Sequence, residues 1–176
     1  MISTSGALAR FALVLALVAT VGAQRRRDPL NPNEADDLRD AAQEPAARLK
    51  LYVGFARTRL TSLEQMRADP KVTDRAQQTH DRLQDFLDVY DEMNDNIDTF
   101  VERKSDLRKP LKAIVEADTE FQARLRALKN SLNASKEEAG QYDFVLTNVL
   151  ETLESSSQDH RQLLKQQEEQ GGPRKK

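Results

Sequence analysis

The chain has no cysteine and no tryptophan, and its 176 residues include only six glycines and six prolines. The lack of cysteine excludes disulfides, thiolate metal sites, c-type haem attachment and a lipoprotein anchor. The scarcity of glycine and proline argues against a sandwich or barrel with many tight turns. Aromatic residues make up 5% of the chain and the formal net charge is -2. These values give no case for binding nucleic acid.

Residues 1–23 have the pattern of a secretory signal peptide. Arg10 is their only charge, the apolar run 11–19 follows it, and Val21 and Ala23 form a cleavage pattern that leaves Gln24 as the new N-terminus. The alternative is an uncleaved anchor, but the stretch 11–23 is shorter than the roughly 20 apolar residues that a span requires. We therefore expect cleavage, no membrane span afterwards, and a periplasmic or extracellular protein.

Hydrophobic periodicity predicts four long helices in the remainder of the chain. They cover about 45–68, from 70 or 74 to 103, 106–132, and from 136 to 170. In the second helix Leu83, Phe86, Tyr90 and Met93 repeat at spacings of three and four. Ser135 and Glu138 fit a capping box for the fourth helix. Residues 24–44 are expected to be a linker or a short helix capped by Asn33, and 170–176 a disordered basic tail.

Short connections between these helices predict an all-α fold, an antiparallel up-down-up-down four-helix bundle over 45–169 with coiled-coil-like packing. Net charge alternates along the chain: +4 over 45–68, -7 over 74–102, +2 over 106–129 and -5 over 136–169. Opposite charges favour contact. The alternation therefore predicts that each helix lies between two helices of opposite sign, with the second kept apart from the fourth.

Asp118 stands out because it occupies a position in the apolar stripe of the third helix. Antiparallel pairing places it level with Tyr90 and Asn94 on the second helix and with Tyr52 on the first. Three interpretations remain: a solvated boundary residue, a ligand or catalytic group, or a buried polar core layer of Asp118, Asn94, Tyr90 and Tyr52. Such a layer fixes the register of helices at some cost in stability.

The remaining polar residues show no catalytic or metal-ligating pattern. The same pairing places His80 and His160 at opposite ends of the bundle, too far apart to share a metal, and both are expected to be boundary residues. The acidic residues of the second helix indicate a solvated face or a partner for the basic helices. We expect no cofactor, no metal and no catalytic residue, because nucleophile motifs and phosphate-binding loops are also missing.

These observations predict an exported, non-enzymatic helical bundle that acts through protein–protein contacts, as a scaffold, adaptor or envelope-stress type binding protein. One alternative is a structural coiled-coil subunit that self-associates into a homo-oligomer. A second is a bundle that binds a small ligand or metal at the Asp118 layer. The partner is unknown, and Phe55, Val115 and Phe144 are the best candidates for a contact patch.

Overall fold

The computed structural model describes residues 28–131 and 140–171, and these ranges contain five helices and no strand. The expected all-helical fold is confirmed. The helices are α1 (Pro32–Asp40), α2 (Pro45–Ala68), α3 (Arg75–Glu102), α4 (Arg108–Ser131) and α6 (Asp143–Gly171). The expected signal peptide, the Ser135 capping box and residues 172–176 of the tail lie outside the described residues.

The first helix is short, and its start differs from the sequence prediction. Asn31, not Asn33, is the N-cap: its side chain accepts from the backbone of Glu34 while the Glu34 carboxylate accepts from the backbone N–H of Asn31. This is a complete capping box. Two arginines of α2 hold α1 in place. Arg59 donates to both carboxylate oxygens of Glu34, and Arg48 donates to the carbonyl oxygen of Leu38.

The end of α3 is a tight left-handed turn. Lys104 has φ 59°, its backbone N–H donates to the carbonyl of Val101, and the N–H of Ser105 donates to the carbonyl of Phe100. These two bonds define a Schellman motif, in which glycine is the usual residue at the left-handed position. The turn ends α3 and directs the chain into α4.

The last helix starts later than the sequence predicted. Residues 140–142 form a turn and α6 begins at Asp143, not at 136. Gly140 lies in this turn, and glycine is a poor helix former because its backbone is free in the unfolded chain. The late start shifts every residue of α6 relative to α4.

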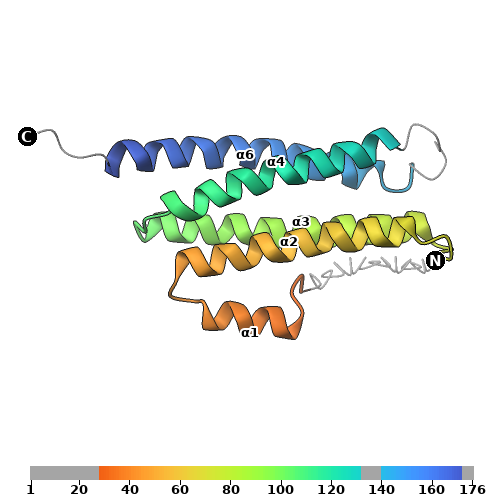
Figure 1. Cartoon of the computed structure of the whole chain (residues 1–176), viewed down its shortest axis with the longest axis horizontal. Helices are drawn as coiled ribbons and strands as arrows, with labels where there is room; N and C mark the ends of the chain where they lie inside the picture. The colour runs from red at the N-terminus through yellow and green to blue at the C-terminus, as the bar shows by residue number, and fades with distance from the viewer. Residues whose placement is uncertain (1–27, 132–139, 172–176) are drawn as a thin grey trace, which may run out of the picture.

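The four long helices pack as two pairs laid over each other (Figure 1). The closest pairs are α2 with α3 and α4 with α6, and the pairs meet where α2 contacts α4 and α3 contacts α6. The colours of Figure 1 show that consecutive long helices run in opposite directions. The short helix α1 lies against α2.

Two of the four contacts predicted from net charge, α2 with α3 and α4 with α6, are observed. The other two are wrong, because the acidic helices α3 and α6 pack together, as do the basic helices α2 and α4. Individual ion pairs explain the contact between α2 and α4. Arg57 of α2 is paired with Glu120 of α4, and Glu64 of α2 with Arg124 of α4. Exposed pairs contribute only about 0–1 kcal/mol each. Net charge therefore could not outweigh burial of the apolar stripes, at about 25 cal/mol per Å².

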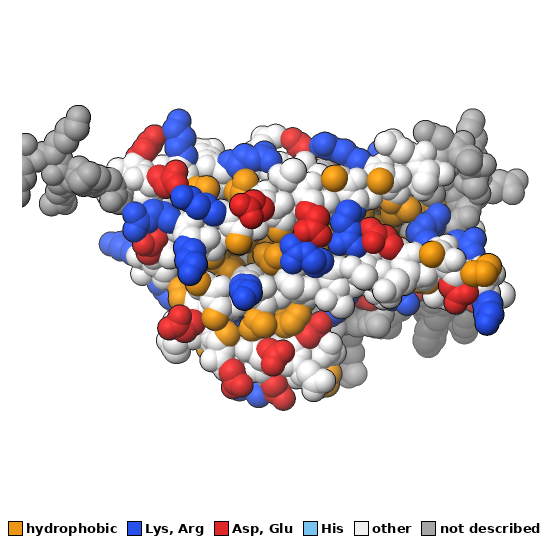
Figure 2. All heavy atoms as spheres, in the orientation of Figure 1, with side chains coloured by type: hydrophobic (Ala, Val, Ile, Leu, Met, Phe, Trp, Pro, Cys, Tyr) orange, Lys and Arg blue, Asp and Glu red, His pale blue; other side chains and the backbone are white. Residues whose placement is uncertain are grey.

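One hydrophobic core runs through the helices. Every described helix contributes to it, from Leu38 of α1 to Leu153 of α6. All three tyrosines of the chain are buried, with Tyr52 at 1% and Tyr90 and Tyr142 at 0% exposure. On the face seen in Figure 2, basic and acidic side chains are interspersed, and many of the apolar atoms lie between the helices. Among the described residues, no helix is long and apolar enough to cross a membrane.

Candidate functional site

The interior of the bundle holds a carboxylate, that of Asp118 on α4, which is completely buried. Its Oδ1 accepts a hydrogen bond of 2.7 Å from the hydroxyl of Tyr90 on α3, and its Oδ2 lies 2.9 Å from Nδ1 of His160 on α6. An ionised carboxylate can only accept hydrogen bonds. The proton of the Asp118–His160 bond therefore belongs to Nδ1 of His160, and the three residues link three helices.

Two further polar side chains extend this cluster. Ser156 of α6 lies beside the Tyr90 hydroxyl, and the Nδ2 group of Asn94 donates to Oγ of Ser156 at 3.0 Å. Asn94 and Ser156 thus join α3 to α6 next to the Tyr90–Asp118 bond.

Tyr90 remains a hydrogen-bond donor throughout the physiological range. Burial raises the pKa of its phenol strongly, and the negative charge of Asp118 and the hydrogen bond to it raise the pKa further. The hydrogen bond from Ser156 lowers this pKa, but by less. We refer to Asn94, Ser156, Tyr90, Asp118 and His160 together as the polar network.

The structure brings three of the four residues of the predicted polar layer into this network. Tyr90 contacts Asp118 directly and Asn94 is joined through Ser156. Tyr52 lies elsewhere: its hydroxyl accepts from Nδ2 of Asn96 at 3.0 Å, at the contact between α2 and α3. The solvated interpretation of Asp118 is wrong, because its carboxylate has no exposure.

His160 is the residue that the sequence prediction misplaced. It was expected at a solvated boundary, level with the start of α4, but it is 4% exposed and bonded to Asp118. The cause is the late start of α6, which brings residue 160, not residue 150, opposite residue 118. A signal was present in the sequence, since His160 continues the buried stripe of Val149, Leu153 and Ser157.

A groove between α3 and α6 lies next to the polar network and has a volume of about 280 Å³. Asn94, Ser156 and His160 reach it from the network. The other side chains of its wall are Ile97, Asp98, Val101, Asp159 and Leu163. The Oδ1 atom of Asn94 is buried without a hydrogen-bond partner in the described structure.

The polar network has some of the parts of a catalytic site. A carboxylate bonded to Nδ1 of a histidine orients the ring, as Asp118 does for His160. Ser156 lies one helical turn from His160, but the hydrogen bond of its Oγ is with Asn94. The geometry therefore gives His160 no activated serine.

The other histidine lies away from this network. His80 has a side chain 43% exposed, with Nδ1 3.3 Å from the carboxylate of Asp81. Over the ranges 28–131 and 140–171, no three side chains of His, Cys, Asp or Glu lie close enough to hold a metal ion.

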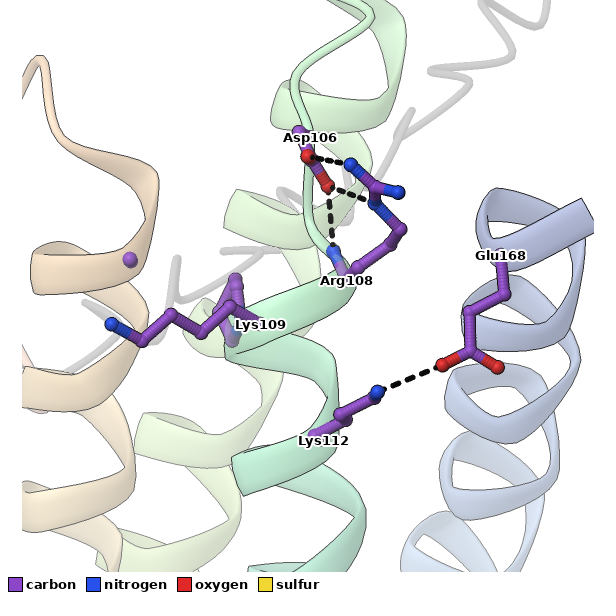
Figure 3. A pocket seen from close by; sticks show the side chains of 7 residues that line it. Asp106, Arg108, Lys109, Lys112 and Glu168 are labelled. Carbon is purple, nitrogen blue, oxygen red and sulfur yellow. Dashed lines mark hydrogen bonds and ion pairs between the residues drawn. The ribbon is translucent and has the colours of Figure 1, made fainter. Parts of the chain in front are cut away.

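A larger hollow lies where the starts of α2 and α4 meet the end of α6 (Figure 3). Its basic side chains have acidic partners within it: Arg108 is paired with Asp106 at 2.5 Å and Lys112 with Glu168 at 2.9 Å. The hydrogen bonds from the Arg108 side chain and backbone lower the pKa of Asp106 to about 2. Lys109 points away from these pairs, toward α2. With its charges largely paired, this hollow is a weaker candidate than the α3–α6 groove.

No protein-family model, curated protein or solved structure matches this chain. Its function therefore has to be argued from the chain's own residues.

Proposed function

We propose that this protein is an exported, non-enzymatic helical bundle that acts through contacts with other proteins, as a scaffold, adaptor or envelope-stress type binding protein. The observation that supports this is the coverage of its apolar stripes within one chain. All five described helices bury their apolar faces in a single core. Val101 and Phe144 are the large apolar side chains that remain exposed in the described ranges. A subunit that completes its core only by self-association needs a longer exposed stripe.

The proposal includes the arrangement of the long helices, an antiparallel up-down-up-down four-helix bundle with coiled-coil-like packing. Opposite directions of consecutive helices and the contacts of α2 with α3 and α4 with α6 support it. The bundle differs from the one expected in the order of helices around its axis. A rigid scaffold of this kind presents fixed side chains to a partner.

Export is part of the same proposal and has its own test. The pattern of residues 1–23 supports cleavage after Ala23, which gives a mature chain that starts at Gln24. The measurement is the mass of the N-terminal peptide of the protein recovered from its native cell envelope or medium. A peptide that begins at Gln24 is the expected result, and a peptide that retains the apolar run contradicts cleavage.

Phe144 is the best single candidate for a contact residue. Its side chain is 87% exposed at the start of α6, whereas Phe55 packs partly against the core and Val115 is half-buried. Exposed single apolar residues are common on proteins, so the choice needs a direct test. Replacing Phe144 by Ala should leave stability within about 0.5 kcal/mol, as for other surface substitutions.

The deciding experiment places a photo-crosslinking amino acid at position 144 and, as a matched control, at the exposed position Glu151 one to two turns along α6. The chain is irradiated in its native envelope, and sedimentation of the purified chain is measured in parallel. A discrete heterologous product from position 144 alone, with a monomeric chain, supports the proposal. Products formed only between copies, with a dimer or larger species in sedimentation, favour the self-associating structural subunit instead.

A further inference from the structure

Two arginines of α2 hold α1 by its two ends. At the start of α1, Arg59 donates to both carboxylate oxygens of Glu34, at 2.8 and 2.6 Å, and to the carbonyl of Pro29 at 2.8 Å. At the other end, Arg48 donates to the carbonyl of Leu38, and the last carbonyls of a helix lack a donor within the helix. The two arginines are about three helical turns apart in sequence, so they lie on the same face of α2.

Beyond these bonds, α1 has little that holds it on the bundle. Glu34 and Leu38 are its buried residues, and Leu38 is its one member of the hydrophobic core. The helix has nine residues, whereas an isolated helix needs about 12–15 residues to be even marginally stable. Segments with few buried apolar contacts open locally while the rest of a protein stays folded. We therefore expect α1 to detach as a unit, with residues 41–44 as the hinge.

Charge also matches α1 to the helix that it covers. The range 32–40 contains four acidic residues and one arginine, a net charge of -3, whereas α2 has a net charge of +4. The side chains of Arg59 and Glu34 are only 17% and 10% exposed, so salt screens their attraction less than that of a surface pair. Complementary charges favour the right partner over others. The covered face of α2 thus selects an acidic helix.

The contacts of α1 define what this face recognises. A glutamate at the third position of the helix meets Arg59, a leucine four residues later enters the core, and a carbonyl near the helix end meets Arg48. The guanidinium fork matches a carboxylate in geometry, and Asn96 of α3 holds Arg48 in place at 2.6 Å. None of these contacts depends on the covalent link between α1 and α2. A helix of another molecule with the same elements can therefore make them.

From these contacts we propose that α1 is a displaceable cover, and that the face of α2 beneath it binds an acidic helix of another protein. That helix carries a glutamate in its first turn and a leucine four residues later, and it takes the place of α1 between Arg59 and Arg48. The inference rests on the proposed contact function and names the chemistry of one partner. The surface is separate from Phe144, because α1 lies against α2 at the edge of the bundle (Figure 1) and Phe144 is at the start of α6.

The test measures, by fluorescence anisotropy, how a labelled peptide with the sequence of residues 28–44 binds to the full chain. Leu38→Asp opens the site, and Asn33→Asp, which adds the same charge at an exposed position of α1, is the matched control. We expect Leu38→Asp to bind the peptide at least about tenfold more tightly than the wild type, because a site that is mostly covered binds with an affinity reduced by its open fraction. The control should bind within about twofold of the wild type.

A second peptide tests which features the face recognises. It keeps asparagine, glutamate and leucine at the spacing of Asn31, Glu34 and Leu38, with alanine and glutamine elsewhere, and it should displace the labelled peptide from the open variant. Glu34→Lys in this peptide should weaken binding at least about tenfold, because Arg59 then faces a positive charge. Arg59→Gln added to the open variant should give a loss of similar size.

Glu34→Arg in the full chain is a second opening variant, since it places two positive charges together, and circular dichroism checks that both opening variants keep the bundle. Binding that is equal in the wild type and both opening variants would show that the peptide does not use the covered face, and it overturns the proposal. So does an absence of saturable binding to both. A wild-type dimer that Leu38→Asp abolishes in sedimentation would also overturn it, because the occupant is then a second copy. The peptide results do not bear on crosslinking at position 144, so the two proposals fail separately.

Discussion

Asp118 on α4 and His160 on α6 are joined at 2.9 Å in the interior of the bundle, although a tight turn between the two helices would place residue 150 opposite residue 118. Both side chains are almost completely buried. A buried carboxylate is costly unless its oxygens receive hydrogen bonds. Tyr90 and His160 provide one bond for each oxygen, and the bond from His160 therefore fixes the alignment of α6 along α4.

Replacing Asp118 by Leu should destabilise the protein by about 2–6 kcal/mol, because the Tyr90 hydroxyl and the His160 N–H each lose a partner at about 1–3 kcal/mol. The triple variant Tyr90→Phe, Asp118→Leu, His160→Leu should recover most of that loss, since it also removes the two donors that Asp118 had satisfied. Urea unfolding measures both. The Tyr52→Phe substitution is the control, because Tyr52 bonds Asn96 and its effect should add to that of Asp118→Leu. A triple variant as unstable as the single one would contradict this account.

Replacing Glu120 by Lys should weaken the contact between α2 and α4. Glu120 accepts hydrogen bonds from Nε and Nη2 of Arg57 and is also paired with Arg124, so the substitution turns attraction into repulsion between two basic helices. A loss of about 1–2 kcal/mol is expected at low salt, and the loss should shrink at high salt because the side chains are partly exposed. Glu116→Lys, on the same helix at an exposed position, is the control and should cost less than about 0.5 kcal/mol. A loss independent of salt would argue against an electrostatic contact.

The attachment of α1 should loosen in acid. Burial alone raises the pKa of Glu34, but hydrogen bonds from Arg59 and the Asn31 backbone, with the Arg59 charge, outweigh burial and hold this pKa below its ordinary value of 4.5. A lowered carboxyl pKa adds stability above the unfolded value, and that stability is lost as pH falls through the folded value. The difference in unfolding free energy between the wild type and Glu34→Gln should be constant well above pH 4.5 and shrink below it. Thermal unfolding across this range measures it, and a difference that grows in acid would be the wrong sign.

Replacing Lys104 by Gly should stabilise the chain by about 1 kcal/mol. Lys104 has a left-handed backbone, which costs a non-glycine residue about 1–2 kcal/mol, and part of the gain is lost to the freedom of glycine in the unfolded state. Arg103→Gly is the control, since Arg103 has an ordinary helical backbone with φ -76° and should lose about 0.5–1 kcal/mol. The midpoint of urea unfolding reports both. Two substitutions with the same sign would show that the turn is not strained.

Helix positions could be predicted from the sequence, because each helix carries its own apolar stripe. The bounds of α2 were predicted as Pro45–Ala68, as observed. The contacts of α2 with α3 and of α4 with α6 could be predicted, but that of α2 with α4 could not. It depends on local pairs such as Arg57 with Glu120, which the summed charge of a helix does not contain. Periodicity also carries no information about where α6 starts, and that start decides which residue meets Asp118.

The polar network, too, could be predicted from the sequence only in part. Asp118 interrupts an apolar stripe, and Tyr90 and Asn94 lie on the helix next in sequence, so their meeting follows from antiparallel pairing alone. Ser156 and His160 enter only through the alignment of α6, which the sequence does not define. Antiparallel pairing places Tyr52 at the same height along the bundle as Asp118, but residues at one height need not touch. Tyr52 lies instead at the contact between α2 and α3.

The three buried tyrosines have a practical consequence. Tyr52 is bonded at the contact of α2 with α3, Tyr90 reaches from α3 to α4, and Tyr142 accepts from Arg67 just before α6. Because the chain has no tryptophan, its near-ultraviolet absorption and emission arise mainly from these three phenols. Each phenol is buried, and each is hydrogen-bonded in a different part of the bundle. The unmodified protein thus contains three optical reporters, and a single tyrosine-to-phenylalanine series can resolve whether its helix pairs separate together or in sequence.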